Sequence, residues 1–214
     1  MPVYALDQSL WFPPVEEANE DGLLAMGGDI SVDRLLLAYK RGIFPWYDGD
    51  TPLWWCPDPR FVLYPGELKI SKSMEALIKK GVFDFTTNTS FAEVIRSCKE
   101  QQRKGQEGTW ITDELEWAFI ELHKLGFAHS AEAWLDGELA GGLYGIRMGK
   151  LFFGESMFSL HSNASKFAFT QFVKELIREN VFLVDCQVYT AHLESLGARM
   201  IPRKTFREIL QKYI

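Results

Sequence analysis

Apolar residues recur at the spacing of an amphipathic helix in five segments of the chain. The clearest is 112–126, which begins with the N-cap residue Thr112, carries acidic residues in its first turn and ends at Gly126. Its apolar stripe consists of Leu115, Ala118, Phe119 and Leu122. The other four helices are predicted over 31–42, 71–81, 90–105 and 164–180, and two short helices finish the chain.

An alternation of apolar and polar positions begins after residue 127. Two glycine-containing turns, Asp136-Gly137 and Met148-Gly149-Lys150, divide segment 128–158 into three strands, which predicts an antiparallel meander. The mostly apolar run 181–188 predicts one further, buried strand. Strands followed by a helix, a strand and another helix indicate an α+β fold.

The first 63 residues follow neither pattern for long and are expected to form a small N-terminal domain. Residues 1 to about 30 contain Pro13-Pro14 and two adjacent glycines, so we expect an irregular segment there. Segment 42–60 is a long loop rich in Pro, Gly, Asp and Trp, and loops of this length usually carry function. The larger domain is expected over residues 64–214.

Composition narrows the class of protein. The chain has 214 residues, of which 47% are hydrophobic and 14% aromatic, as in a folded globular protein. No stretch approaches the ~20 apolar residues of a membrane span, and the N-terminus lacks the pattern of a signal peptide. The three cysteines lie far apart without a CxxC pair, which predicts a cytoplasmic protein without a structural zinc site.

Candidate chemistry lies at the ends of two predicted strands. Asp185 and Gln187 share a face of one strand, and Glu155 interrupts an apolar stretch. Each carboxylate alone has a structural explanation, Asp185 as a helix cap and Glu155 as the partner of a buried cation. Together they suggest an apolar pocket with an acidic edge, which suits a ligand with one apolar and one cationic part. The apolar residues are Phe152, Met157, Phe172 and Val184. Cys186 is expected to point away and pack.

Aromatic and basic residues suggest contact with a nucleic acid. Trp46 and Trp110 each lie beside an abrupt turn or a helix start, and indoles on loops stack on nucleobases. Trp54 and Trp55 are expected to pack instead.

The net charge of −6 argues against a general nucleic-acid coat but allows a local basic patch. Lys72, Lys79 and Lys80 share one helical face, and Arg96, Lys99 and Arg103 share another. A plain solvated face explains the second set equally well.

Seven short strings occur in order along the chain: GLLAMGGDIS, YKRGIFPW, LWWCPDPR, EGTWIT, GESMFS, NASK and DCQV. Together they resemble the bacterial leucyl/phenylalanyl-tRNA–protein transferases over residues 11 to about 203. The resemblance implies a small N-terminal domain followed by a GNAT-like mixed-sheet domain. It also implies transfer of Leu or Phe, less readily Met, from aminoacyl-tRNA to proteins with N-terminal Lys or Arg, which marks them for N-degron degradation.

The resemblance also assigns roles to individual residues. Asp185 and Gln187 correspond to a catalytic pair, and Glu155 to an acidic group near the acceptor. The pocket for the donor side chain is lined by Phe152, Met157, Phe172 and Val184, whereas the terminal adenosine is held by Trp46, Trp110 and Tyr39. Phe119 stands where a tyrosine hydroxyl is often found. The tRNA is bound by Lys72, Lys79 and Lys80, although Ala76 replaces a basic residue of other members. No cofactor, metal or membrane is implied, and we expect a monomer.

Two other functions remain open. One is an acyl-CoA-dependent N-acyltransferase, but the nearest string to its pyrophosphate loop, QRKGQE at 102–107, fails at the last position. The other is a non-catalytic module that binds basic N-termini, which needs the acidic pocket but not the tryptophan pair.

Overall fold

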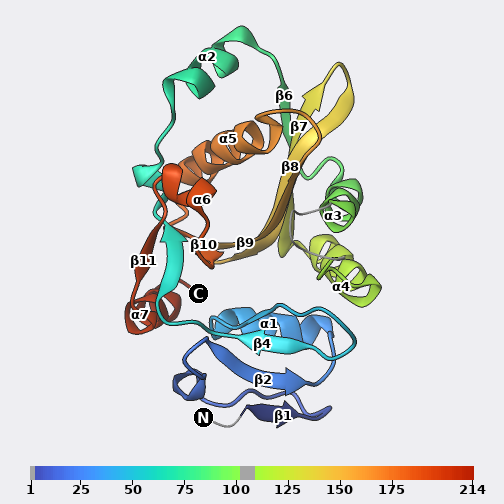
Figure 1. Ribbon diagram of the computed structural model, residues 1–214, viewed down its shortest axis with the longest axis vertical. Helices are drawn as coiled ribbons and strands as arrows, with labels where there is room; N and C mark the ends of the chain where they lie inside the picture. The colour runs from blue at the N-terminus through green and yellow to red at the C-terminus, as the bar shows by residue number, and fades with distance from the viewer. Residues whose placement is uncertain (1–2, 102–108) are drawn as a thin grey trace.

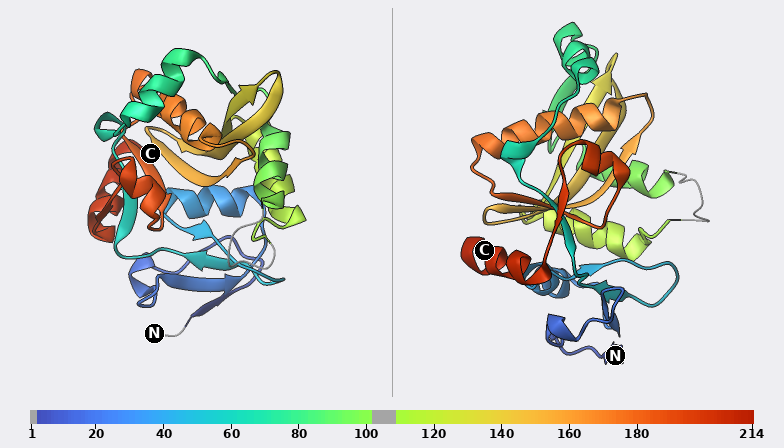
Figure 2. Two further views of the ribbon diagram at one scale, coloured as in Figure 1. Left: turned by 45° about the horizontal axis from the view of Figure 1, so that its top comes forward. Right: turned by 60° about the vertical axis from the view of Figure 1, so that its left-hand side comes forward.

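A computed structural model describes residues 3–101 and 109–214 of the chain (Figure 1). They form a small sheet with one helix and a larger sheet covered by helices on both faces (Figures 1 and 2). The expected α+β fold, a small N-terminal part followed by a mixed-sheet part, is confirmed by this arrangement.

The small sheet has the strand order β1-β2-β4-β3. Its strands are β1 (Tyr4–Leu6), β2 (Leu23–Gly27), β3 (Phe44–Pro45) and β4 (Leu53–Trp55), packed with helix α1 (Val32–Lys40). The irregular segment expected at the N-terminus and the loop expected over 42–60 are therefore wrong in part. These strands have two to five residues each, too few to produce a recognisable alternation.

The large sheet has the order β11-β5-β10-β9-β8-β7-β6. Its strands are β11 (Arg199–Ile201), β5 (Arg60–Leu63), β10 (Leu183–Gln187), β9 (Leu151–Ser159), β8 (Glu138–Met148), β7 (Ala128–Leu135) and β6 (Asp84–Thr87). The antiparallel meander β7-β8-β9 and the buried strand β10 are confirmed. The edge strands β6 and β11 were not predicted, because both are short and follow no clear alternation.

Helix α5 (Ala164–Arg178) covers one face of the large sheet, whereas α3 (Phe91–Glu100) and α4 (Asp113–Lys124) cover the other (Figure 1). The remaining helices are α2 (Lys72–Lys80), α6 (Ala191–Ser195) and α7 (Arg203–Tyr213). Helices α1, α2 and α4 begin as the sequence predicts, with a serine or threonine side chain that accepts a backbone N–H at the third position of the helix.

Strand β5 bears on the expected domain boundary. Its residues Arg60–Leu63 pair with β10 and β11 in the large sheet, although the boundary at residue 63 assigned them to the N-terminal domain. We therefore propose a boundary between β4 and β5, at about residues 56–59.

Two irregularities interrupt the large sheet at its centre. Among the strands of residues 3–101 and 109–214, β9 and β10 form the only parallel pair of this sheet, and their pairing ends at Asp185 and Phe153. Opposite β8, Tyr144 pairs with Ser156 and Gly145 with Gly154, so Glu155 is the extra residue of a β-bulge. On β10 the register against β5 shifts between Asp185 and Gln187. Bulges re-aim side chains and often lie beside active sites.

Candidate active site

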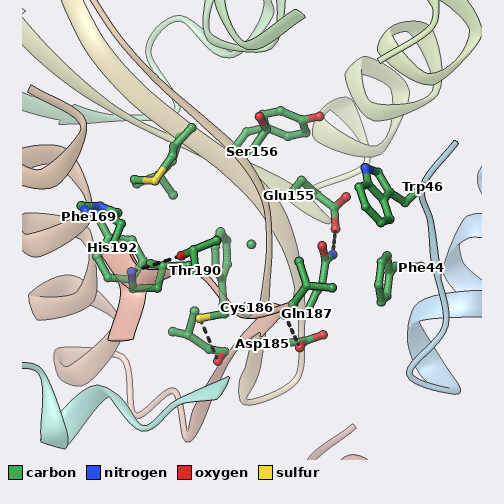
Figure 3. Close-up of a pocket in the computed structure, with 18 of the residues that line it drawn as sticks. Phe44, Trp46, Glu155, Ser156, Phe169, Asp185, Cys186, Gln187, Thr190 and His192 are labelled. Carbon is green, nitrogen blue, oxygen red and sulfur yellow. Dashed lines mark hydrogen bonds between the residues drawn. The ribbon is translucent and has the colours of Figure 1, made fainter. Parts of the chain in front are cut away.

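A cavity of about 420 Å³ opens where β9 and β10 separate. Both bulged segments line it, together with the β3 segment of the N-terminal part, helix α5 and the residues around α6 (Figure 3). Of the residues that the sequence assigns to the site, it brings together Trp46, Trp110, Phe152, Glu155, Met157, Val184, Asp185 and Gln187. Tyr39, Phe119 and Phe172 do not line this cavity.

The polar wall of the cavity is a chain of hydrogen bonds. Gln187 donates from Nε2 to Oε1 of Glu155 over 2.8 Å, and its backbone N–H donates to Oδ1 of Asp185 over 3.0 Å. Gln187 has a φ of +64°, in the left-handed region that side-chain-bearing residues seldom adopt. These bonds hold the strand end in a conformation that aims the amide at Glu155.

Asp185 is fully buried and already paired. Both its oxygens accept hydrogen bonds from Arg60, from Nε over 2.8 Å and from Nη2 over 2.6 Å. Arg60 is not predicted as a site residue from the sequence, because it lies in the loop-like string LWWCPDPR. The one available signal was Asp185 itself, since a carboxylate in a buried strand requires a cation or several donors.

Glu155 has a different environment. It is half-buried, its Oε2 has no hydrogen-bond partner among the described residues, and no cation of those residues pairs with it. Burial, and after it the charge of Asp185, raises the pKa of the Glu155 carboxyl group, whereas nearby Tyr39, Gln187 and Arg60 lower it. The net result of these effects is a pKa of about 8. A carboxyl group with this pKa is largely protonated at pH 7 and ionises readily when a cation approaches.

Tyr39 and Phe119 lie behind the cavity wall. Tyr39 is fully buried, and its hydroxyl lies near Glu155 but outside hydrogen-bonding geometry. Burial, followed by the charge of Glu155, raises the pKa of the Tyr39 hydroxyl. Phe119 packs edge-on against Tyr144, with ring centroids 5.2 Å apart, and it is Tyr144 that lines the cavity.

The apolar wall is formed by residues from β8, β9, β10 and α5. Phe152, Met157 and Val184 line it as the sequence predicts, together with Leu143 and Phe169. Phe172 instead packs edge-on behind Phe152, with a centroid distance of 4.8 Å. Phe172 therefore shapes the cavity only by supporting Phe152.

The tryptophans differ in exposure, and Trp110 is buried, which corrects the expectation that it is as available as Trp46. Trp46 is 41% exposed and lines the cavity beside Glu155 (Figure 3). Trp110 lines the cavity as well. Trp54 is fully buried and donates to the carbonyl of Gly27 over 2.9 Å. Trp55 donates to the carbonyl of Trp46 over 2.6 Å and so fixes the segment that carries the exposed indole.

The end of the cavity opposite Trp46 carries residues that the sequence analysis did not select. Thr190, His192 and Phe169 lie there (Figure 3). Burial lowers the pKa of the His192 imidazole, and its Nε2 has no hydrogen-bond partner among the described residues. Cys186 also lines the cavity, which corrects the expectation that it only packs; burial raises the pKa of its thiol.

The two basic sets on helices differ in their partners. Lys72, Lys79 and Lys80 are exposed on α2, at the top of Figure 1, and α2 contributes no residue to the cavity. Arg96 and Lys99 on α3 are instead held by carboxylates of α4, Arg96 by Glu116 over 3.1 Å and Lys99 by Asp113 and Glu116. Arg103 and the string QRKGQE lie outside the described residues. The ion pairs favour the structural explanation for the second set.

Residues 3–101 and 109–214 contain no group of three or more His, Cys, Asp or Glu side chains placed to hold a metal ion. In the same residues, no helix combines the length and the apolar character needed to cross a bilayer.

Comparison with known proteins places the chain in a family. A model of the leucyl/phenylalanyl-tRNA protein transferase family matches residues 62–211, and the model of its N-terminal domain matches residues 28–58. The chain is 55% identical over 210 residues to a leucyl/phenylalanyl-tRNA–protein transferase of Flavobacterium johnsoniae, covering 98% of this chain and 99% of that protein. It is 53% identical over 215 residues to the transferase of Syntrophobacter fumaroxidans, covering 100% and 92%.

Solved structures are more distant. A GCN5-related N-acetyltransferase from Kribbella flavida has a TM-score of 0.41 and 9% identity, covering 78% of this chain and 59% of its own. The family models and the full-length relatives decide the assignment. The chain belongs to the leucyl/phenylalanyl-tRNA–protein transferase family and is an aminoacyltransferase.

Proposed function

We propose that the protein transfers Leu or Phe, less readily Met, from aminoacyl-tRNA to the α-amino group of proteins with N-terminal Lys or Arg. The product is marked for degradation by the N-degron pathway in the cytoplasm. The observation that carries this proposal is a cavity in which an apolar wall, an exposed indole and an ionisable carboxyl group meet. The names of the full-length relatives support the donor and the class of acceptor.

The proposed donor fills the cavity from two sides. The amino-acid side chain contacts Phe152, Met157 and Val184, which line the apolar wall. The adenine of the terminal adenosine stacks on Trp46, which is exposed, with Trp110 lining the same space. This arrangement places the ester between the indoles and the apolar wall, within reach of the polar wall.

The reaction is aminolysis of an ester that is already activated. The acceptor amine attacks the ester carbonyl and an amide bond forms, while the ester C–O bond breaks. The ribose oxygen leaves as a hydroxyl and takes the proton that the amine loses. Orientation of the two reactants is worth up to ~7–11 kcal/mol in favourable cases, so the site needs no covalent intermediate.

Gln187 and Glu155 are the groups proposed to contact the amine. Since Nε2 of Gln187 donates to Glu155, the amide oxygen of Gln187 is left to accept a hydrogen bond from the amine. Positive charge develops on the nitrogen as it attacks, and ionised Glu155 stabilises it. Asp185 borders the cavity but is fully buried, and both its oxygens already accept hydrogen bonds from Arg60. We therefore propose that it acts by holding the backbone of Gln187 rather than by contacting the substrate.

The tRNA body is proposed to contact α2. Lys72, Lys79 and Lys80 are exposed, and no ion pair of the described residues engages them. Contacts of this kind go to phosphates, so they add affinity without reading sequence.

The donor decides between the three functions. The protein is incubated with a peptide that begins with Arg and with either Leu-tRNA or acetyl-CoA, and the peptide mass is measured. Addition of leucine from Leu-tRNA alone supports the proposal. Acetylation from acetyl-CoA supports an acyl-CoA-dependent enzyme, and binding of the peptide without any product supports a non-catalytic module.

A further inference from the structure

Arg60 is a buried cation that contacts two aromatic rings as well as its carboxylate partner. It is 1% exposed, and its guanidinium carbon lies 4.7 Å from the ring centroid of Phe44 and 4.8 Å from that of Phe206. Two parallel hydrogen bonds join it to Asp185. The planar guanidinium thus contacts two aromatic rings and binds the carboxylate with two nitrogens, an arrangement that a lysine amine cannot reproduce.

A buried ion pair is weak evidence for stability, because desolvation offsets most of the attraction between its charges. The pair between Arg60 and Asp185 also affects the conformation of Gln187. Oδ1 of Asp185, which accepts from Nε of Arg60, also accepts the backbone N–H of Gln187 over 3.0 Å. Gln187 keeps its left-handed φ of +64° at this point and presents its side-chain amide to Glu155.

The residues Arg60, Asp185, Gln187 and Glu155 therefore form one continuous chain of hydrogen bonds that starts in the core and ends in the cavity. Phe44, whose ring centroid lies 4.7 Å from the guanidinium carbon of Arg60, also lines the cavity beside Trp46 (Figure 3). One buried guanidinium thus contacts both the polar chain and the aromatic wall.

We infer that Arg60 is a positioning residue for aminoacyl transfer, which orients Gln187 and Glu155 through Asp185 without touching either substrate. The inference rests on the proposed function of the cavity. It assigns to the string LWWCPDPR a role in the chemical step in addition to its place in the fold.

The test is the variant Arg60→Lys, which keeps the charge and removes the two-pronged geometry. Single-turnover transfer of leucine from Leu-tRNA to an Arg-starting peptide should slow by about 10- to 100-fold, because small displacements of catalytic groups have effects of this size. The KM for Leu-tRNA should change less than about threefold, since Trp46, Met157 and the α2 lysines are unaffected.

A pH profile separates positioning from general loss of structure. The hydrogen bond from Gln187 favours the ionised form of Glu155. When Gln187 is no longer held, the midpoint of the transfer rate should move to higher pH by about half a unit to one unit. The acceptor amine is the same in both measurements, so its own titration does not change the comparison.

The matched control is Arg34→Lys. Arg34 is equally buried and pairs with Asp29 over 3.0 Å, but neither residue lines the cavity. This variant should lose thermal stability and keep the wild-type rate and pH midpoint while it remains folded. Equal slowing in both arginine variants would overturn the inference.

A second variant serves if Arg60→Lys does not fold. The pair Arg60→Gln with Asp185→Asn leaves no unpaired charge in the core, yet joins the two side chains by weaker hydrogen bonds. It should also slow transfer at least about tenfold. A wild-type rate and pH midpoint in either folded variant overturns the role of Arg60. If the wild-type protein itself does not transfer leucine, the proposed function fails instead.

Discussion

The amide of Gln187 donates a 2.8 Å hydrogen bond to Glu155, and this contact joins the ends of two strands that have just ceased to pair. Each residue lies at an irregularity, Glu155 as the extra residue of a bulge and Gln187 at a positive φ. The contact therefore depends on local departures from regular strand geometry. It brings an ionisable carboxyl group to the wall of an otherwise apolar cavity.

The raised pKa of Glu155 predicts a pH-dependent difference in stability. Its pKa is about 8 in the folded protein against an ordinary value of 4.5, so between these pH values the unfolded chain releases a proton that the folded chain retains. Wild-type stability should therefore fall as pH rises from about 4.5 to 8. Glu155→Gln does not titrate, so the difference between its Tm and that of the wild type should change in favour of the variant by about 10 °C between pH 5 and pH 9. Each pKa unit is worth ~1.4 kcal/mol, and ~1 kcal/mol corresponds to about 2–4 °C. A Tm difference that stays constant across this range would contradict the shift.

The apolar wall predicts different results for two residues that the sequence places in one pocket. Met157 lines the cavity, so Met157→Ala should raise the KM for Leu-tRNA about 10- to 100-fold and leave binding of deacylated tRNA nearly unchanged. Phe172 packs behind Phe152, so Phe172→Ala should mainly lose stability, by ~3–5 kcal/mol. Steady-state kinetics and thermal melts of both variants check this. Equal losses of donor and deacylated tRNA for Met157→Ala would remove it from the donor pocket.

The exposed lysines of α2 predict a salt-dependent effect. Changing both Lys79 and Lys80 to Ala should weaken binding of Leu-tRNA and reduce the slope of log K against log salt by about 1 to 2, because each phosphate contact contributes ~0.7–0.9. A leucyl-adenosine donor without the tRNA body should be used as well as before. The control changes Arg96 and Lys99, which already pair with carboxylates of α4. A larger effect in the control would move the tRNA footprint to α3.

The sequence predicts the elements whose signals are long and local. The meander follows from two glycine turns and a clear alternation, and helix α4 follows from its N-cap and its apolar stripe. Strands β1 to β4 are not predicted from the sequence, because two to five residues are too few to show a periodic pattern. The placement of Glu155, Gln187 and Trp46 around one cavity agrees with the resemblance of the motifs.

The remainder of the site depends on contacts between distant segments. Arg60 is 125 positions from Asp185 in the chain, and nothing in LWWCPDPR shows that its guanidinium is buried. The left-handed φ of Gln187 cannot be predicted from the sequence either, because glutamine has no preference for this backbone conformation. Tyr39, Phe119 and Phe172 are large side chains that suit a pocket by type, yet core packing places them behind its wall.

The proposed mechanism requires Gln187 and Glu155, joined by their hydrogen bond, to orient the acceptor amine and stabilise its charge during aminoacyl transfer. The most direct measurement is the single-turnover rate of leucine transfer to an Arg-starting peptide by Gln187→Met, which keeps the length of the side chain and removes both hydrogen-bonding atoms. The rate should fall by ~10²–10⁴, as for the loss of a group that assists proton transfer or charge development, with affinity for Leu-tRNA nearly intact. A folded Met variant that transfers leucine at close to the wild-type rate would contradict the claim.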